Sequence, residues 1–125
     1  MRVILHGGYT GIWDGAGEDT VLFQKLIDAA EQADKRVMIS FLAYEKPTDW
    51  PHLDQLKETF QKLNPDIQLV IAGRDNFRDL LPHHQVLFLQ GGNSRAHETA
   101  LADITKEEIT HNKIFLAGSS SGAML

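Results

Sequence analysis

Residues 113–123 read KIFLAGSSSGA, an apolar run followed at once by small and polar residues. The first five of these residues predict a buried strand, and Gly118, Ser120 and Gly122 fit the pattern GxSxG of a nucleophile elbow. In such an elbow the nucleophile lies on a tight turn between a strand and a helix, and the small residues leave room for the backbone. Ser120 is therefore the predicted nucleophile. The alternative is a turn that only links a strand to a helix or binds an anion.

A second glycine-rich turn, at residues 91–94, follows the apolar run at residues 85–90. The turn after the elbow serine directs the N–H of Ser121 at the developing oxyanion, and Gly92 is the predicted source of a second N–H donor. Gly91 gives the backbone the freedom to approach a ligand closely, and Asn93 either caps the next helix or contacts the substrate. A plain Gly-Gly turn with Asn93 as helix cap is the alternative.

Further out, short apolar runs alternate with segments of helical period, which is typical of an α/β fold with a parallel sheet. Five strands are predicted, at residues 2–6, 36–42, 67–72, 85–90 and 113–117. Helices are expected at 21–33, 53–63 and 95–103, with one short helical turn at 76–81. The sequence thus predicts a single domain over residues 1–125, a Rossmann-like three-layer parallel sheet. Ligands of such sheets bind beyond the carboxyl ends of the strands.

Composition excludes several classes of protein. The 125 residues contain no cysteine and carry a formal net charge of −5, so a disulfide framework is excluded and no nucleic-acid partner is expected. No apolar run approaches the roughly 20 residues that a membrane helix needs, and no export signal is visible, so a cytoplasmic setting is expected. The glycine-rich stretch 7–17 lacks the GKS or GKT of a phosphate loop, and neither a cofactor nor a metal is expected.

The pair of motifs resembles a known enzyme family. GGN at 91–93, followed by GxSxGA at 118–123, each after a buried strand, is similar to peptidase E (aspartyl dipeptidase) and the cyanophycinase-like enzymes. The resemblance covers essentially the whole chain and implies a class I glutamine amidotransferase-like fold. It also implies that Ser120 is the nucleophile, that Gly92 and Ser121 are the oxyanion donors, and that Asn93 contacts the substrate.

The sequence departs from that family after the elbow. The family's catalytic histidine and acidic partner follow the nucleophile, whereas only five residues follow Ser120 here. The sequence therefore resembles the N-terminal half of an enzyme, truncated after the elbow. The expected source of the base is a C-terminal companion chain. The strand at 113–117 is expected to be an exposed edge that pairs with this companion or with a second copy.

Histidines and arginines within the chain offer further candidates. His83, His84 and His111 precede strands and are expected to be solvated loop residues at the wrong edge of the sheet. His6, His52 and His97 follow strands, and His97 is the first internal candidate for a base because its helix starts beside the Gly-Gly turn. Three arginines near the carboxyl edge are candidates for binding an acidic substrate or a peptide carboxylate, or are simply solvated: Arg74, Arg78 and Arg95.

The function predicted from these observations is a serine peptidase that hydrolyses small peptides, Asp-containing dipeptides among them, through an acyl-enzyme on Ser120. The alternative is a catalytically inactive peptidase-like fragment or binding module that keeps the fold.

Overall fold

The computed structural model describes residues 2–6, 18–90, 95, 99, 101–102 and 104–119. Strands and helices alternate along this part of the chain, as the sequence predicts. The strands are β1 (Arg2–His6), β2 (Arg36–Ser40), β3 (Gln68–Ala72), β4 (Val86–Leu89) and β5 (Phe115–Ser119). The helices are α1 (Glu18–Glu31), α2 (Leu53–Leu63), α3 (Phe77–Leu80) and α5 (Lys106–Thr110), with short 3₁₀ turns η2 (Pro47–Asp49) and η3 (Leu81–His83).

The five strands form one sheet in the order β1-β5-β4-β2-β3, and every neighbouring pair is parallel. The α/β fold class with a parallel sheet is therefore confirmed. The expectation that the last strand is an exposed edge is wrong, because β5 lies between β1 and β4 and pairs with both. In the described sheet β1 and β3 are the edge strands.

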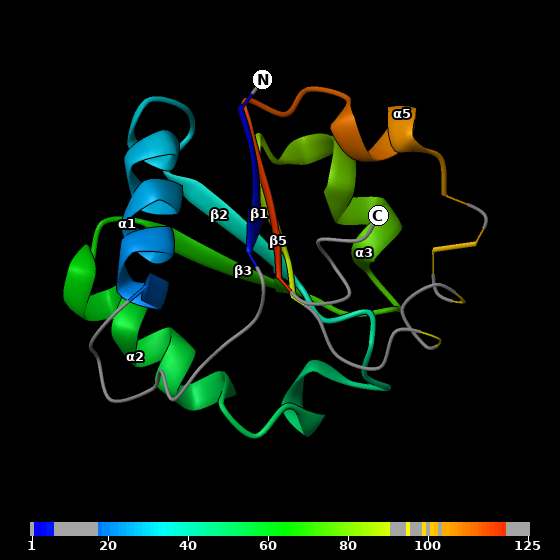
Figure 1. Ribbon diagram of the computed structural model, residues 1–125, viewed down its shortest axis with the longest axis horizontal. Helices are drawn as coiled ribbons and strands as arrows, with labels where there is room; N and C mark the ends of the chain where they lie inside the picture. The colour runs from blue at the N-terminus through cyan, green and yellow to red at the C-terminus, as the bar shows by residue number, and fades with distance from the viewer. Residues whose placement is uncertain are drawn as a thin grey trace.

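Helices cover both faces of the sheet, which gives three layers (Figure 1). On one face, α1 and α2 pack on alternate strand residues, including Ile39, Phe88 and Phe115, and the rings of Phe23 and Phe60 join the two helices at 4.9 Å between centroids. On the other face, α3 and α5 pack on the intervening residues, including Met38 and Leu87. All four residues of β4 are buried, as expected for a strand covered on both faces.

Two helical segments differ from the sequence-based expectation. α5 was not predicted, because its five residues bring only one buried apolar side chain, Ile109, to the core. Its start is set by a capping box in which Thr105 accepts a hydrogen bond from the N–H of Glu108. Of the helix expected at 95–103, Arg95 and Thr99 are helical, and most of the rest lies outside the described residues.

Candidate active edge of the sheet

The carboxyl ends of β4 and β5 lie side by side. Leu89 of β4 is in register with Gly118 of β5, and on the other side of β5 Gly118 is in register with Leu5. The backbone N–H of Gln90, just beyond β4, donates to the carbonyl of Ser40 at 3.0 Å, so the end of β4 is also tied to β2. The segments that follow β4 and β5 therefore leave the sheet from neighbouring strands at the same edge.

The predicted site residues follow these two strand ends in the sequence. Ser120, Ser121, Gly91, Gly92 and Asn93 are outside the described residues, so their roles stay predictions. The described residues that lead into both turns, Gln90 and Gly118, are buried.

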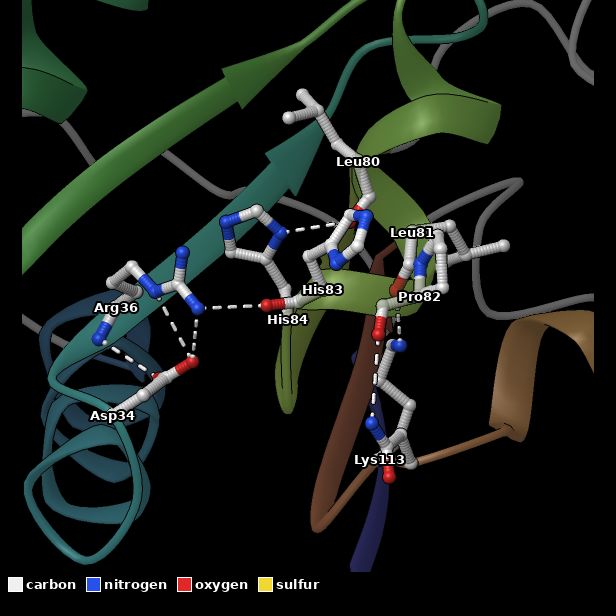
Figure 2. Close-up of polar contacts among 9 residues, drawn as sticks. Asp34, Arg36, Leu80, Leu81, Pro82, His83, His84 and Lys113 are labelled. Carbon is white, nitrogen blue, oxygen red and sulfur yellow. Dashed lines mark hydrogen bonds and ion pairs between the residues drawn. The ribbon is translucent and has the colours of Figure 1, made fainter.

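Three histidines lie at the opposite edge, where β4 and β5 begin. His83 and His111 are exposed, as expected, but His84 is 3% exposed, so the expectation of a solvated residue is wrong for it. Its burial is compensated by a hydrogen bond, in which Nδ1 donates to the carbonyl oxygen of Leu80 at 2.8 Å (Figure 2). A five-residue strand is about 16 Å long, whereas proton transfer needs a contact of about 3 Å. These three histidines therefore lie about one strand length from the carboxyl end of β5, which is too far for a base that acts at that edge.

The histidines that follow strands differ in their positions. His6 is the last residue of β1, and its Cα is paired with that of Ser119, the residue before the predicted nucleophile. His52 precedes α2, and its ring meets that of Trp50 edge-on at 5.7 Å between centroids. His97 lies outside the described residues. The strand order, which the sequence did not reveal, brings the end of β1 beside the end of β5.

Arg74 is the candidate carboxylate-binding residue with a defined position at the carboxyl edge. It follows β3, its side chain is exposed, and its Nε donates to the carbonyl of Leu42 at 3.0 Å. Arg78, one turn further on in α3, and Arg95 are also exposed. Sequence reasoning could not separate the three, because the anchor of Arg74 lies 32 positions away along the chain.

Ser40 is a site that sequence reasoning missed. It ends β2, is fully buried, and its hydroxyl has no hydrogen-bond partner among the described residues. Its strand neighbours are Ala72 of β3 and Leu89 of β4. Nothing in a run such as Val-Met-Ile-Ser distinguishes an unsatisfied serine from a satisfied one, because the partner, where there is one, comes from another strand.

The crystal structure of a peptidase from an acI-B1 Actinobacterium has a fold similar to that of this chain, with a TM-score of 0.56 and 13% sequence identity. At this identity the likeness concerns the fold, an α/β protein with a parallel sheet. The similarity covers 98% of this chain and 55% of the other, so the chain spans about half the length of that peptidase. No protein-family model and no curated protein matches the sequence.

Among the described residues there is neither a helix that could span a membrane nor a cluster that could hold a metal ion. None of the helices in these ranges is both long and apolar enough to cross a bilayer. Within the same ranges, no three histidine, aspartate or glutamate side chains gather in a way that would hold a metal ion.

Proposed function

We propose that this chain carries the nucleophile of a serine hydrolase of the peptidase E type, acting on short peptides. Ser120 Oγ attacks the carbonyl carbon of a peptide bond while a base takes its proton. The N–H groups of Gly92 and Ser121 stabilise the oxyanion, and Gly91 and Asn93 contact the substrate. The C–N bond then breaks, the proton passes to the leaving amine, and water hydrolyses the acyl-enzyme.

One observation carries this proposal: β4 and β5 are adjacent and parallel, with Leu89 in register with Gly118. The Gly-Gly turn and the serine turn therefore start from neighbouring strands at one edge, which is the arrangement that a serine nucleophile and its second oxyanion donor require. The likeness to a solved peptidase structure supports the same reading of the fold.

The base is proposed to come from polypeptide outside residues 1–125, either a companion chain or another part of the protein. The described histidines at the amino edge are a strand length away from the carboxyl end of β5, which favours an outside source. His6 and His97 are the internal alternatives, His6 because its Cα pairs with that of Ser119. The proposal includes a cytoplasmic setting, with which a sequence free of cysteine is compatible.

The competing proposal is a binding module that keeps the fold without catalysis. The presence of a histidine-bearing companion in the purified protein, seen by intact-mass measurement, favours the hydrolase. If residues 1–125 alone hydrolyse dipeptides, the base is internal, and His6→Ala and His97→Ala then identify it.

Ser120→Ala tests the proposal directly. In the protein purified with its companion, this variant is expected to lose hydrolysis of a dipeptide panel by on the order of 10⁴-fold or more, because the attacking oxygen is removed. Ser119→Ala is the matched control, since it removes a neighbouring hydroxyl and is expected to cost little. Retention of full activity in Ser120→Ala would refute the mechanism.

A further inference from the structure

In the described sheet, β3 is an edge strand whose outer side is partly open to solvent (Figure 1). β2 is its neighbour on one side, and Leu69, Val70 and Ile71 are all half-buried, whereas every residue of β4 is buried. Edge strands often carry a charged residue or a proline that prevents pairing with another chain. Gln68–Ala72 contains neither, so β3 lacks this protection within the strand itself.

The backbone of β3 offers hydrogen-bonding groups on its open side. The N–H of Gln68 donates to the carbonyl of Lys35, and the carbonyl of Ala72 accepts from the N–H of the residue that follows β2, both at 2.9 Å. These two residues of β3 therefore direct their backbone groups toward β2. Because successive residues of a strand direct these groups to alternate sides, Leu69 and Ile71 direct two donors and two acceptors away from β2.

An apolar groove runs beside the same strand. It lies between α2 and β3, has a volume of about 270 Å³, and is lined mostly by apolar side chains, among them Phe60, Leu69 and Ile71. Leu69 and Ile71 pack against the core on the α2 face of the sheet, but part of each side chain stays exposed. A strand added to β3 places every second side chain over this groove.

The strand β3 is suited to pair with a second copy of itself in antiparallel orientation. With Val70 on a two-fold axis, Leu69 lies opposite Ile71 of the second copy, and the reverse holds on the other side of the axis. Because both residues direct their backbone groups outward, this register forms four hydrogen bonds between the copies. A register shifted by two residues moves a pair onto Ile67 or Gly73, whose N–H groups are already bonded within the chain.

The charges that flank β3 are complementary in the same arrangement. Asp66 and Arg74 are both exposed, and they lie at equal distances along the chain from Val70, on opposite sides of it. At each end of the paired segment, Asp66 of one copy is therefore brought toward Arg74 of the other. A parallel pairing in register brings like charges together instead, so the charges favour the antiparallel, two-fold arrangement.

We propose that β3 is a dimerisation edge, at which two copies of this chain join their sheets through antiparallel β3 strands. The two five-stranded sheets then form one continuous sheet, and the Leu69 and Ile71 side chains of both copies cover the two grooves. Because the strand pair is short, the dissociation constant of the dimer is expected to be on the order of 10 µM. This inference does not depend on the hydrolase function.

Sedimentation equilibrium of the complete protein, from roughly 1 to 500 µM, spans the expected dissociation constant and tests for the dimer. The wild-type protein is expected to change from monomer to dimer over this range. Leu69→Pro removes an N–H that points away from β2 and leaves the bonds to β2 in place. This variant is expected to stay monomeric at all concentrations, with an unchanged circular dichroism spectrum.

Two charge variants test the register, and they remain informative if the proline variant does not fold. Asp66→Arg and Arg74→Asp each set like charges against one another at both ends, and each is expected to weaken the dimer about 10-fold. A mixture of the two variants restores opposite charges at both ends, so a heterodimer of near wild-type affinity is expected. Glu107→Arg is the matched control, because it reverses an exposed carboxylate on α5 and is expected to leave dimerisation unchanged.

Amide hydrogen exchange, measured residue by residue, gives an independent readout. From low to high concentration, the amides of Leu69 and Ile71 are expected to gain protection, whereas that of Gln68 is already bonded to Lys35 and is expected to change little. The proposal is overturned by a protein that stays monomeric over the whole range, or by a dimer that Leu69→Pro and both charge variants leave intact. Protection of the Leu69 and Ile71 amides in a monomer also overturns it, because another segment then covers the edge.

Discussion

Ser40 is fully buried, and its hydroxyl has no hydrogen-bond partner among the described residues. A hydroxyl that loses water without gaining a partner costs about 1–3 kcal/mol, and the Oγ of Ser40 has lost its water at the end of β2. The neighbouring strands supply apolar side chains and backbone groups already paired in the sheet. Ser40 therefore lowers the stability of the fold next to its candidate active edge.

Ser40→Ala is expected to raise the free energy of unfolding by about 1 kcal/mol, because it removes the unsatisfied hydroxyl and leaves only a small void. Urea denaturation of both proteins measures the difference. Thr59→Ala is the control, because the Thr59 hydroxyl is exposed and donates to the carbonyl of Gln55, and its loss is not expected to stabilise. A clear loss of stability in Ser40→Ala would mean that the hydroxyl has a partner in solution.

The 3₁₀ turn η3, at the amino edge of the sheet, is held by side chains from several parts of the chain. The carbonyl of Leu81 in η3 accepts from Nζ of Lys113 at 2.7 Å, and that of His83 accepts from Arg36 at 2.8 Å (Figure 2). Arg36 is itself paired with Asp34 at 2.9 Å. These contacts join η3 to the starts of β5 and β2. They explain how a lysine is kept in a buried position before an apolar strand.

Lys113→Met tests the electrostatic part of this junction. Burial lowers the pKa of Lys113 from its ordinary value of 10.5, so the unfolded chain binds more protons between the lowered pKa and pH 10.5. Within that window the wild-type protein is expected to gain stability relative to Lys113→Met as the pH rises, because the burial penalty on the charge disappears. Below the window the difference is constant, and there the variant lacks the donor to Leu81.

The measurement is urea denaturation of both proteins from pH 7 to pH 10.5. Lys25→Met serves as the matched control, because it removes an exposed lysine of α1 that takes no part in this junction. A stability difference between wild type and Lys113→Met that does not change with pH would contradict the prediction.

The elements themselves were largely predictable. An apolar run such as Val-Leu-Phe-Leu in β4 predicts a buried strand. The apolar residues Leu22, Leu26 and Ala30 recur on one helical face and predict α1. What could not be predicted was the order of strands: β5 has the same apolar character whether it lies inside the sheet or at its edge. Its neighbours depend on how each crossover is packed, and that choice is not encoded within the strand.

The candidate site was predictable in part for the same reason. The GxSxG pattern is local, so Ser120 and its turn can be proposed from the residues alone. The pairing of His6 with Ser119 and the bond from Arg74 to Leu42 join segments distant along the chain. Such contacts leave no pattern in a single sequence, and the fold is needed to find them.

For the whole molecule, the strand order means that β1 has β5 as its sheet neighbour in the described part of the chain. Arg2 pairs with Phe115 and His6 with Ser119, so the two strands are separated by about 110 residues of chain. Closing so long a loop costs more entropy than the local pairings of β2 with β3 and β4. β1 is therefore expected to join the sheet last.

Pulse-labelling hydrogen exchange during refolding tests this order. Amides of β2, β3 and β4 are expected to become protected before those of β1. Simultaneous protection of all five strands, or earlier protection of β1, would contradict it.

The same pairing has a consequence for synthesis in the cell. β1 leaves the ribosome about 110 residues before its sheet neighbour β5, so it stays unpaired until β5 has emerged. Throughout translation an apolar Val-Ile-Leu stretch is thus available to chaperones and to other nascent chains, and the rate of elongation sets how long that exposure lasts.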